Sequence, residues 1–356
     1  MNGVKKVSFP SFTHYNYAFK YFMENGVGAR YIMPPQMTLR TLDRGTKASP
    51  DYVCTPFKTT LGSMMDCLEA GADTIFMTMG LCRLGYYGEL QEQILRDMGY
   101  QFDFVNLSEY STGKRRDYIK ALKRLNPRMS VAKMMLVLAE TVKLVEQLDE
   151  AEAMYYKNCG FEKVKGSCKT AIKRYHTAVE TATTGRELEA AYKKFKKEFN
   201  DIELDKPENP LKVGVVGEFL TAQDAFSNLD VEQKLADMGV EVYRYLNATS
   251  RMFHYKGKNL QVETSEYCKY DMGPTSTINI WAAKSYASHS FDGIVHIKSA
   301  GCTPEIDIMP VLHNISEDYK IPVLYLTYDS QTSDTGLATR LEAFYDMIQM
   351  RKKVIR

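Results

Sequence analysis

The chain lacks the features that would assign it to a membrane or to nucleic acid. Its 356 residues contain no run of about eighteen consecutive apolar residues, the length that suggests a membrane-spanning helix. Neither sign of charge is in excess, since 46 basic and 44 acidic side chains give a formal net charge of +2. This balance argues against a dedicated nucleic-acid or polyanion binder. The first residues contain no long apolar core of a secretion signal, so we expect a cytoplasmic protein.

Cysteine is scarce, and its spacing lacks the common metal-binding patterns. The seven cysteines include no Cys-x-x-Cys pair, which is present in zinc ribbons and ferredoxins. Seven thiols in a chain of this length, without export, do not suggest a disulfide framework. The remaining options in a reducing compartment are buried core thiols, a metal site or a reactive thiolate.

Strand-like and helix-like segments alternate in two stretches of the chain. This alternation fills residues 1–112 and returns in residues 207–356, whereas residues 113–206 contain no strand-like run and are typical of a helical insert. It predicts parallel sheets with right-handed crossovers. We therefore expect an α/β protein with two Rossmann-like parallel-sheet lobes joined by a helical insert. The expected strands are residues 5–10, 29–35, 73–79, 102–107, 211–219, 240–246, 291–299 and 321–329.

Three cysteines share one position in this pattern. Cys54 ends the run DYVC, and Cys82 and Cys302 each follow a strand-like run. All three precede a predicted helix, and the first and last begin the same tripeptide, Cys-Thr-Pro. Threonine is a good helix cap and proline suits the first turn of a helix. Ligands of open α/β sheets collect beyond the carboxyl ends of the strands, where helix N-termini favour thiolates and anionic clusters. Gly80 and Gly301 would let the backbone approach a bulky group closely.

The other cysteines have a simpler interpretation. A lone cysteine is more often a small buried hydrophobic residue than a ligand. Cys67 falls in the middle of a predicted helix, Cys159 and Cys168 have no metal-binding spacing, and Cys268 lies in a loop without nearby glycine. For the three strand-end cysteines, spacing alone does not decide between a metal site and buried thiols.

Several motifs resemble the 2-hydroxyacyl-CoA dehydratase superfamily. The resemblance is closest to the branch of double-cubane cluster proteins and activase-associated proteins, and it covers roughly residues 1–107 and 211–350. The motifs that carry it are "CTPFKTTLGSMMDCLEAGADTIFM" (54–77), "GLCRLGYYGELQEQILRDMGY" (80–100), "GVVGEF" (214–219), "SAGCTPEIDIMPVL" (299–312) and "SQTSDTGLATRLEAFYDMI" (330–348).

The resemblance implies an iron–sulfur protein. In that superfamily three cysteines of each subunit bind iron–sulfur, and they match Cys54, Cys82 and Cys302. Dehydratases hold a [4Fe–4S] cluster in each subunit, whereas double-cubane proteins hold two cubanes that share a sulfide, [8Fe–9S], across a homodimer. Both types receive electrons from a separate activator that hydrolyses ATP and carries its own [4Fe–4S] cluster. This chain has no such ATPase segment, so we expect a homodimer that uses an activator supplied in trans.

Three charged residues are candidates for catalysis. Arg83 adjoins Cys82 and would offset the charge of a cluster, although a surface ion pair is an equally good interpretation. Glu218 follows a glycine at a strand end and would supply protons to a reducing site. Glu305 lies in the first turn of a predicted helix, where capping is favoured over proton delivery. His296 lies inside a predicted strand and is expected to be a satisfied core residue.

Three functions are compatible with these residues. The first is an activator-dependent, low-potential iron–sulfur reductase of a small substrate. The second is a 2-hydroxyacyl-CoA dehydratase subunit, in which an open iron site would act as Lewis acid and one-electron donor to the thioester. The third is a non-enzymatic electron carrier or accessory protein. The cysteine turn resembles the activase-associated branch more than the dehydratase subunits, which favours the first.

Overall fold

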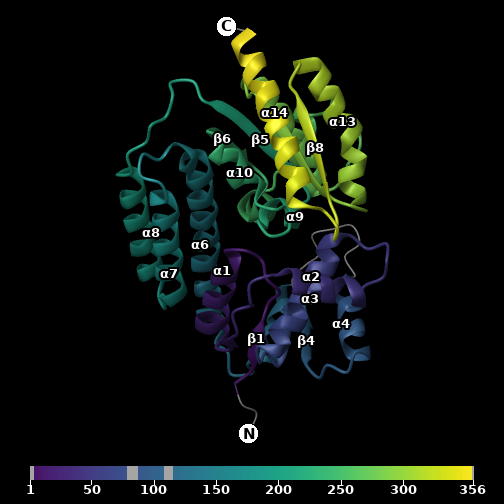
Figure 1. Cartoon of the computed structure of the whole chain (residues 1–356). Helices are drawn as coiled ribbons and strands as arrows, with labels where there is room; N and C mark the ends of the chain where they lie inside the picture. Colours follow the sequence, from purple (N-terminus) through teal and green to yellow (C-terminus); the bar gives the residue numbers. More distant parts are fainter. Residues whose placement is uncertain (1–3, 78–86, 108–114, 355–356) are drawn as a thin grey trace. The chain divides into compact units, whose positions relative to one another are not determined.

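A computed structural model describes residues 4–77, 87–107 and 115–354 of the chain (Figure 1). The chain forms two compact units. Unit 1 comprises Met1–Leu148 and Tyr175–Lys193, and unit 2 comprises Asp149–Arg174 and Lys194–Arg356. Each unit contains a four-stranded sheet in which all strands are parallel, so the predicted α/β class is confirmed. None of the described helices combines the length and the apolar character needed to cross a membrane.

Unit 1 is built on the sheet β2-β1-β3-β4. Its strands are β1 (Lys6–Ser8), β2 (Arg30–Tyr31), β3 (Thr74–Met77) and β4 (Asp103–Asn106). All four residues of β3 are buried, as expected for a parallel strand that is covered on both faces. The helices between and after these strands are α1 (Tyr15–Tyr21), continued by a π-helix (Phe22–Val27), α2 (Leu39–Ala48), α3 (Thr55–Glu69), α4 (Tyr87–Asp97) and α5 (Arg115–Leu125).

Unit 2 repeats this topology in the sheet β6-β5-β7-β8. Its strands are β5 (Leu211–Gly217), β6 (Val240–Arg244), β7 (Gly293–Ser299) and β8 (Val323–Tyr328). In both sheets the first strand in sequence lies between the second and the third. The chain therefore passes from one side of this first strand to the other when it forms the third strand. The helices of this part are α9 (Phe219–Gln223), α10 (Val231–Asp237), a π-helix (Thr249–Phe253), α11 (Gly257–Glu263), α12 (Pro274–Ser288), α13 (Thr303–Tyr319) and α14 (Asp334–Val354).

Two glycines allow helices to pack closely on the two faces of the unit 2 sheet. Gly214 of β5 lies against the ring of Tyr286 from α12, and Gly293 of β7 lies against Phe344 from α14. Because alternate residues of a strand point to opposite faces, the residues of β7 at even positions lie on the face covered by α12 and α13. His296 is therefore on the side of α13.

The middle of the chain is helical, as predicted. It contains α6 (Val131–Asn158), a short 3₁₀ turn (Cys159–Phe161), α7 (Ser167–Thr181) and α8 (Gly185–Asn200). Thr184 and Glu187 have the sequence spacing that predicts a capping box before α8. The structure confirms it, because Thr184 Oγ1 accepts from the amide of Glu187 while the Glu187 carboxylate accepts from the amide of Thr184. The division into units runs through this segment, since Asp149–Arg174 belong to unit 2.

A close contact between α2 and α3 sets the position of α3 in unit 1. The two helices pack along their lengths (Figure 1). A Cβ atom on Gly62 would overlap the backbone oxygen of Thr41, and one on Gly45 would overlap that of Lys58. Lys58 lies one turn after Cys54, so the absence of side chains at these two glycines decides where the beginning of α3 is held.

We expect Gly62→Ala to lower the free energy of unfolding by about 1–3 kcal/mol, because the added methyl group must displace backbone of α2. Urea denaturation measures the change. Gly336→Ala is the control, since a Cβ at this position of α14 would meet only the Ser333 hydroxyl, at 3.4 Å, and alanine favours a helix by roughly 0.5–1 kcal/mol over glycine. A Gly62→Ala variant as stable as the wild type would contradict this account of the α2–α3 contact.

A buried charge network joins α6 to β6 and α10 within unit 2. The guanidinium of Arg244 forms an ion pair with Glu152, and its Nε lies 3.1 Å from Oε1 of Glu232. Its Nη1 donates to the backbone oxygen of Leu246 (3.1 Å). Burial raises the pKa of the Glu232 carboxyl to about 7, and the neighbouring Glu152 adds to the increase while Arg244 opposes it.

This raised pKa makes stability depend on pH. Between about pH 4.5 and pH 7 the folded chain keeps a proton on Glu232 that the unfolded chain releases, so the unfolding free energy decreases as the pH rises through this window. The contribution of one such group is at most about 1.4 kcal/mol per pH unit. We expect Glu232→Gln to flatten the pH dependence measured by chemical denaturation at pH 5, 6, 7 and 8.

Glu342→Gln is the matched control, because Glu342 lies on the exposed side of α14. Its pH profile should follow that of the wild type. A Glu232→Gln profile with the wild-type slope would show that Glu232 does not titrate in this window.

Candidate functional site

Cys54 lies at the N-cap of α3, with Thr55 as the first helical residue and Pro56 as the second. The expectation that it ends a strand is wrong, because residues 51–53 form a turn and a bend, and the preceding element is α2. The threonine also does not cap the helix, since the cysteine occupies that position. The Sγ atom lies 3.9 Å from the hydroxyl of Tyr87, the first residue of α4.

Cys302 occupies the same position in unit 2. It is the N-cap of α13, with Thr303 and Pro304 as the first two helical residues. Ser299 ends β7 three residues earlier, and Gly301 makes the tight turn with a φ of +78°, a conformation that favours glycine. The repeated tripeptide therefore marks two helix starts, and only in unit 2 does it directly follow a strand.

The third predicted ligand falls outside the described residues. Cys82, Gly80 and Arg83 belong to residues 78–86, which the structure does not describe. Cys54 belongs to unit 1 and Cys302 to unit 2. Within the described part of the chain, no group of three or more His, Cys, Asp and Glu side chains gathers in an arrangement that would hold a metal ion.

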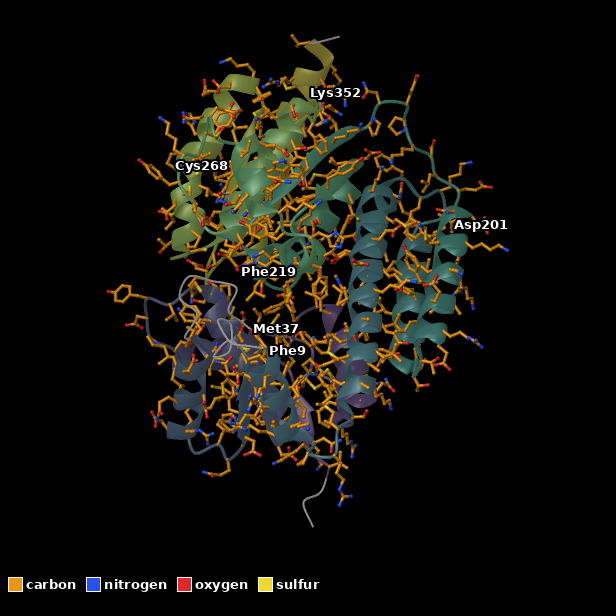
Figure 2. The ribbon with its side chains drawn as sticks, turned by 180° about the vertical axis from the view of Figure 1, so that it is seen from behind. Phe9, Met37, Asp201, Phe219, Cys268 and Lys352 are labelled. Carbon is orange, nitrogen blue, oxygen red and sulfur yellow. The ribbon has the colours of Figure 1, made fainter. Side chains whose placement is uncertain are left out.

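The remaining cysteines differ from these two in their surroundings. Cys67, Cys159 and Cys168 are buried, and burial raises the pKa of their thiols to about 11, 12 and 12, respectively. Cys268 is half-buried, and its Sγ donates to the backbone oxygen of Tyr270 (3.0 Å). Figure 2 shows Cys268 well apart from Phe219, the residue that begins α9 after β5. That these four thiols are not ligands stays a prediction.

Glu305 belongs to a buried hydrogen-bond network at the carboxyl ends of β5 and β7. Its side chain is fully buried, Oε1 accepts from Nδ2 of Asn279 (3.1 Å), and Oε2 lies 2.8 Å from Nε2 of His296. The same amide of Asn279 donates to the backbone oxygen of Gly217 (2.8 Å), and its Oδ1 accepts from the amide of Gly217 (3.2 Å). The expected capping role of Glu305 is therefore wrong, because both oxygens bind other elements.

His296 is only partly satisfied. The residue is fully buried, its ring meets the ring of Tyr325 edge-on at 5.5 Å, and its Nε2 binds Glu305. Its Nδ1, however, is buried without a hydrogen-bond partner among the described residues. Most buried polar atoms in folded proteins have a partner, so this atom needs an explanation.

Glu218 is the helix cap of α9. Its carboxylate accepts from the amides of Leu220 (3.0 Å) and Thr221 (2.7 Å) and from the hydroxyl of Thr221 (2.7 Å). Desolvation raises the pKa of the Glu218 carboxyl against the effect of these donors, and the negative charge of Glu305 adds to the increase. Two carboxyl groups that influence each other thus lie at the point where the strand order of this sheet reverses, the usual ligand position in such folds.

Sequence reasoning identified Glu218, Glu305 and His296 as separate residues and missed Asn279, which joins two of them. Asn279 lies in the middle of α12, and no motif marks it. It also missed Lys298, which lies on the same face of β7 as His296 with only 8% of its surface exposed. The alternation of polar residues at positions 296 and 298 in an otherwise apolar strand was the available signal.

No protein-family model matches the chain, and no curated protein matches it.

Thiol alkylation of the folded, iron-free protein tests the distinction between the cysteines. We expect Cys54 and Cys302 to react faster with iodoacetamide than Cys268, although all three are partly exposed, because helix N-termini favour the reactive thiolate. The buried thiols of Cys67 and Cys168 should stay unmodified until the chain unfolds. Mass spectrometry after timed labelling at pH 8 gives the rates. Equal rates for Cys302 and Cys268 would show that the helix start has no effect on the thiol.

Proposed function

We propose that the chain is an iron–sulfur protein of the double-cubane and dehydratase type, with Cys54, Cys82 and Cys302 as ligands. The observation that carries the proposal is the repeated position of Cys54 and Cys302. Both lie at the N-cap of a long helix before a Thr-Pro start, in two units with the same sheet order. The resemblance of the surrounding motifs to that superfamily supports the same ligands and adds Cys82.

The donor chemistry of the two described cysteines fits such a group. Thiolates are the usual ligands of iron–sulfur clusters, and backbone N–H groups directed at sulfur tune the reduction potential. The second helical residue of α3 and α13 is Pro56 or Pro304, which has no N–H group, so the thiolates themselves are the donors that fit a cluster. Gly301, next to Cys302, has no side chain and takes a left-handed conformation with a φ of +78°. When bound, the cluster would supply one-electron transfer at low potential.

The proposed activity is reduction of a small substrate with electrons from a separate ATP-hydrolysing activator. In this proposal the chain acts as a homodimer in the cytoplasm, and two linked cubanes store more than one electron. The chain's own contribution is to hold the sulfur ligands at helix starts and to place carboxyl groups near one of them. Glu305 lies three residues after Cys302, and both oxygens of its carboxyl group are held by neighbouring side chains.

Anaerobic iron and sulfide analysis tests the proposal. We expect about eight irons per dimer and a brown protein that loses its colour in air. Cys82→Ala, Cys54→Ala and Cys302→Ala should each lose most of the iron and of the visible absorbance. Cys268→Ala is the matched control, since Cys268 is partly exposed, like Cys54 and Cys302, but lies in a loop. Equal iron in Cys302→Ala and Cys268→Ala, or no iron in the wild type, would overturn the assignment of the ligands.

A further inference from the structure

Helix α14 has two apolar stripes, although the fold of unit 2 uses only one of them. The first consists of four buried residues, Leu337, Leu341, Phe344 and Ile348. Phe344 packs against Gly293 of β7, so this stripe holds the helix on the sheet (Figure 1). A helix that covers one face of a sheet needs one apolar stripe, and its opposite side is normally polar.

The second stripe lies on the solvent side and repeats the spacing of the first. It comprises Ala343, Met347, Met350 and Val354, and we call it the α14 stripe. All four residues are exposed, and the last three keep 44%, 64% and 84% of their surface in solvent. Residues at such intervals of three and four lie along one line of a helix, as in the seam of a coiled coil. Single exposed apolar residues are ordinary, whereas a row of them over about three turns marks a contact surface.

The charges beside the α14 stripe differ in sign between its two ends. Asp346 and Lys353 are seven residues apart, so they lie on the same flank of the stripe, and both are exposed. Neither has an ion pair or a hydrogen bond among the described residues. The last turn of the helix is basic, with Arg351 and Lys352 beside Lys353. A surface that is acidic towards one end and basic at the other is complementary to an inverted copy of itself.

An antiparallel pair of α14 helices satisfies both the stripe and the charges. In an isologous contact the same surface is used by both copies, so a two-fold axis between Met347 and Met350 sets each of them against the other one from the second copy. This axis keeps the same flank of both helices on one side of the seam. Asp346 of each copy then lies within about one turn of Lys353 of the other. A parallel pair would instead bring the two basic last turns together.

We propose that the α14 stripe binds the α14 stripe of a second copy of this chain in an antiparallel arrangement. The inference rests on α14 alone and not on the iron–sulfur ligands, and it gives the homodimer of the proposed function an interface. About three helical turns cover less than the roughly 800 Å² per partner of a standard interface. The dimer is therefore in equilibrium with the monomer, and its fraction depends on concentration.

Sedimentation equilibrium of the full-length, iron-free chain from about 2 to about 200 µM tests the interface. The average mass of the wild type should rise with concentration from the 40.7 kDa of one chain towards twice that value. Met350→Ser should weaken association about tenfold or more, because it removes apolar contact at the centre of the seam in both copies. Met98→Ser is the control and should associate like the wild type, since Met98 is similarly exposed, at 51%, but lies outside α14.

Charge reversal tests the antiparallel register. Asp346→Lys and Lys353→Glu should each weaken association about tenfold, because each sets like charges against one another at two places in the dimer. An equimolar mixture of the two variants should associate as tightly as the wild type. In the mixed dimer one copy carries two positive charges at these positions and the other carries two negative charges. Circular dichroism confirms that the variants fold.

The failure of this inference is distinguishable from the failure of the proposed function. A wild type that stays monomeric, which would leave the stripe to a different protein, or a Met350→Ser variant that associates as tightly as the wild type, would overturn the inference. A mixture of the charge variants that associates no better than each variant alone would do the same. The iron analysis is a separate measurement. Iron lost from Cys302→Ala beside a monomeric wild type leaves the proposed ligands standing, and a dimer without iron leaves the α14 interface standing.

Discussion

The geometry of parallel strands is the constraint on which the rest of this structure depends. Successive parallel strands need a crossover helix, and the right-handed twist of the chain brings these helices back so that they begin at the carboxyl edge of the sheet. In each unit the strand order reverses between the first and third strands, β1 and β3 or β5 and β7. Helix starts therefore gather at one edge of each sheet. Both described candidate cysteines lie at such a helix start.

The two units reach this arrangement with different supporting contacts. In unit 1, α3 is placed by the glycine contact with α2, where backbone meets backbone and only the absence of Cβ atoms allows the approach. In unit 2, α13 is tied to β7 and α12 by the carboxylate of Glu305, which bonds to His296 and Asn279. The contact in unit 1 is steric and involves no charged group. The contact in unit 2 is polar and buried.

Burial of the Glu305 carboxyl group is unfavourable by itself, and hydrogen bonds from neighbouring side chains offset this. An ionised carboxyl group away from water is unfavourable unless it accepts hydrogen bonds. Here it receives them from an asparagine that is itself held by both backbone groups of Gly217. Asn279 thus links the carboxyl end of β5 to the start of α13 with one side chain. A network of this kind fixes one arrangement of the strand ends, because a change in any of its members leaves a buried polar atom unsatisfied.

The sequence by itself determined the class of the fold, because alternating apolar runs and helical periodicity are local properties. It located the strand that contains His296, the capping box at Thr184 and the helix starts within the two Cys-Thr-Pro tripeptides. It failed where an assignment depended on neighbours from elsewhere in the chain. The residues before Cys54 are not a strand, since no partner strand pairs with them, and Glu305 does not cap its helix, since α12 and β7 bring it better donors. Only the tertiary structure decided that Glu305, Asn279 and His296 share one network, in which Nδ1 of His296 has no hydrogen-bond partner among the described residues. The reason is that these contacts join residues 9 to 26 positions apart through packing that no local pattern encodes.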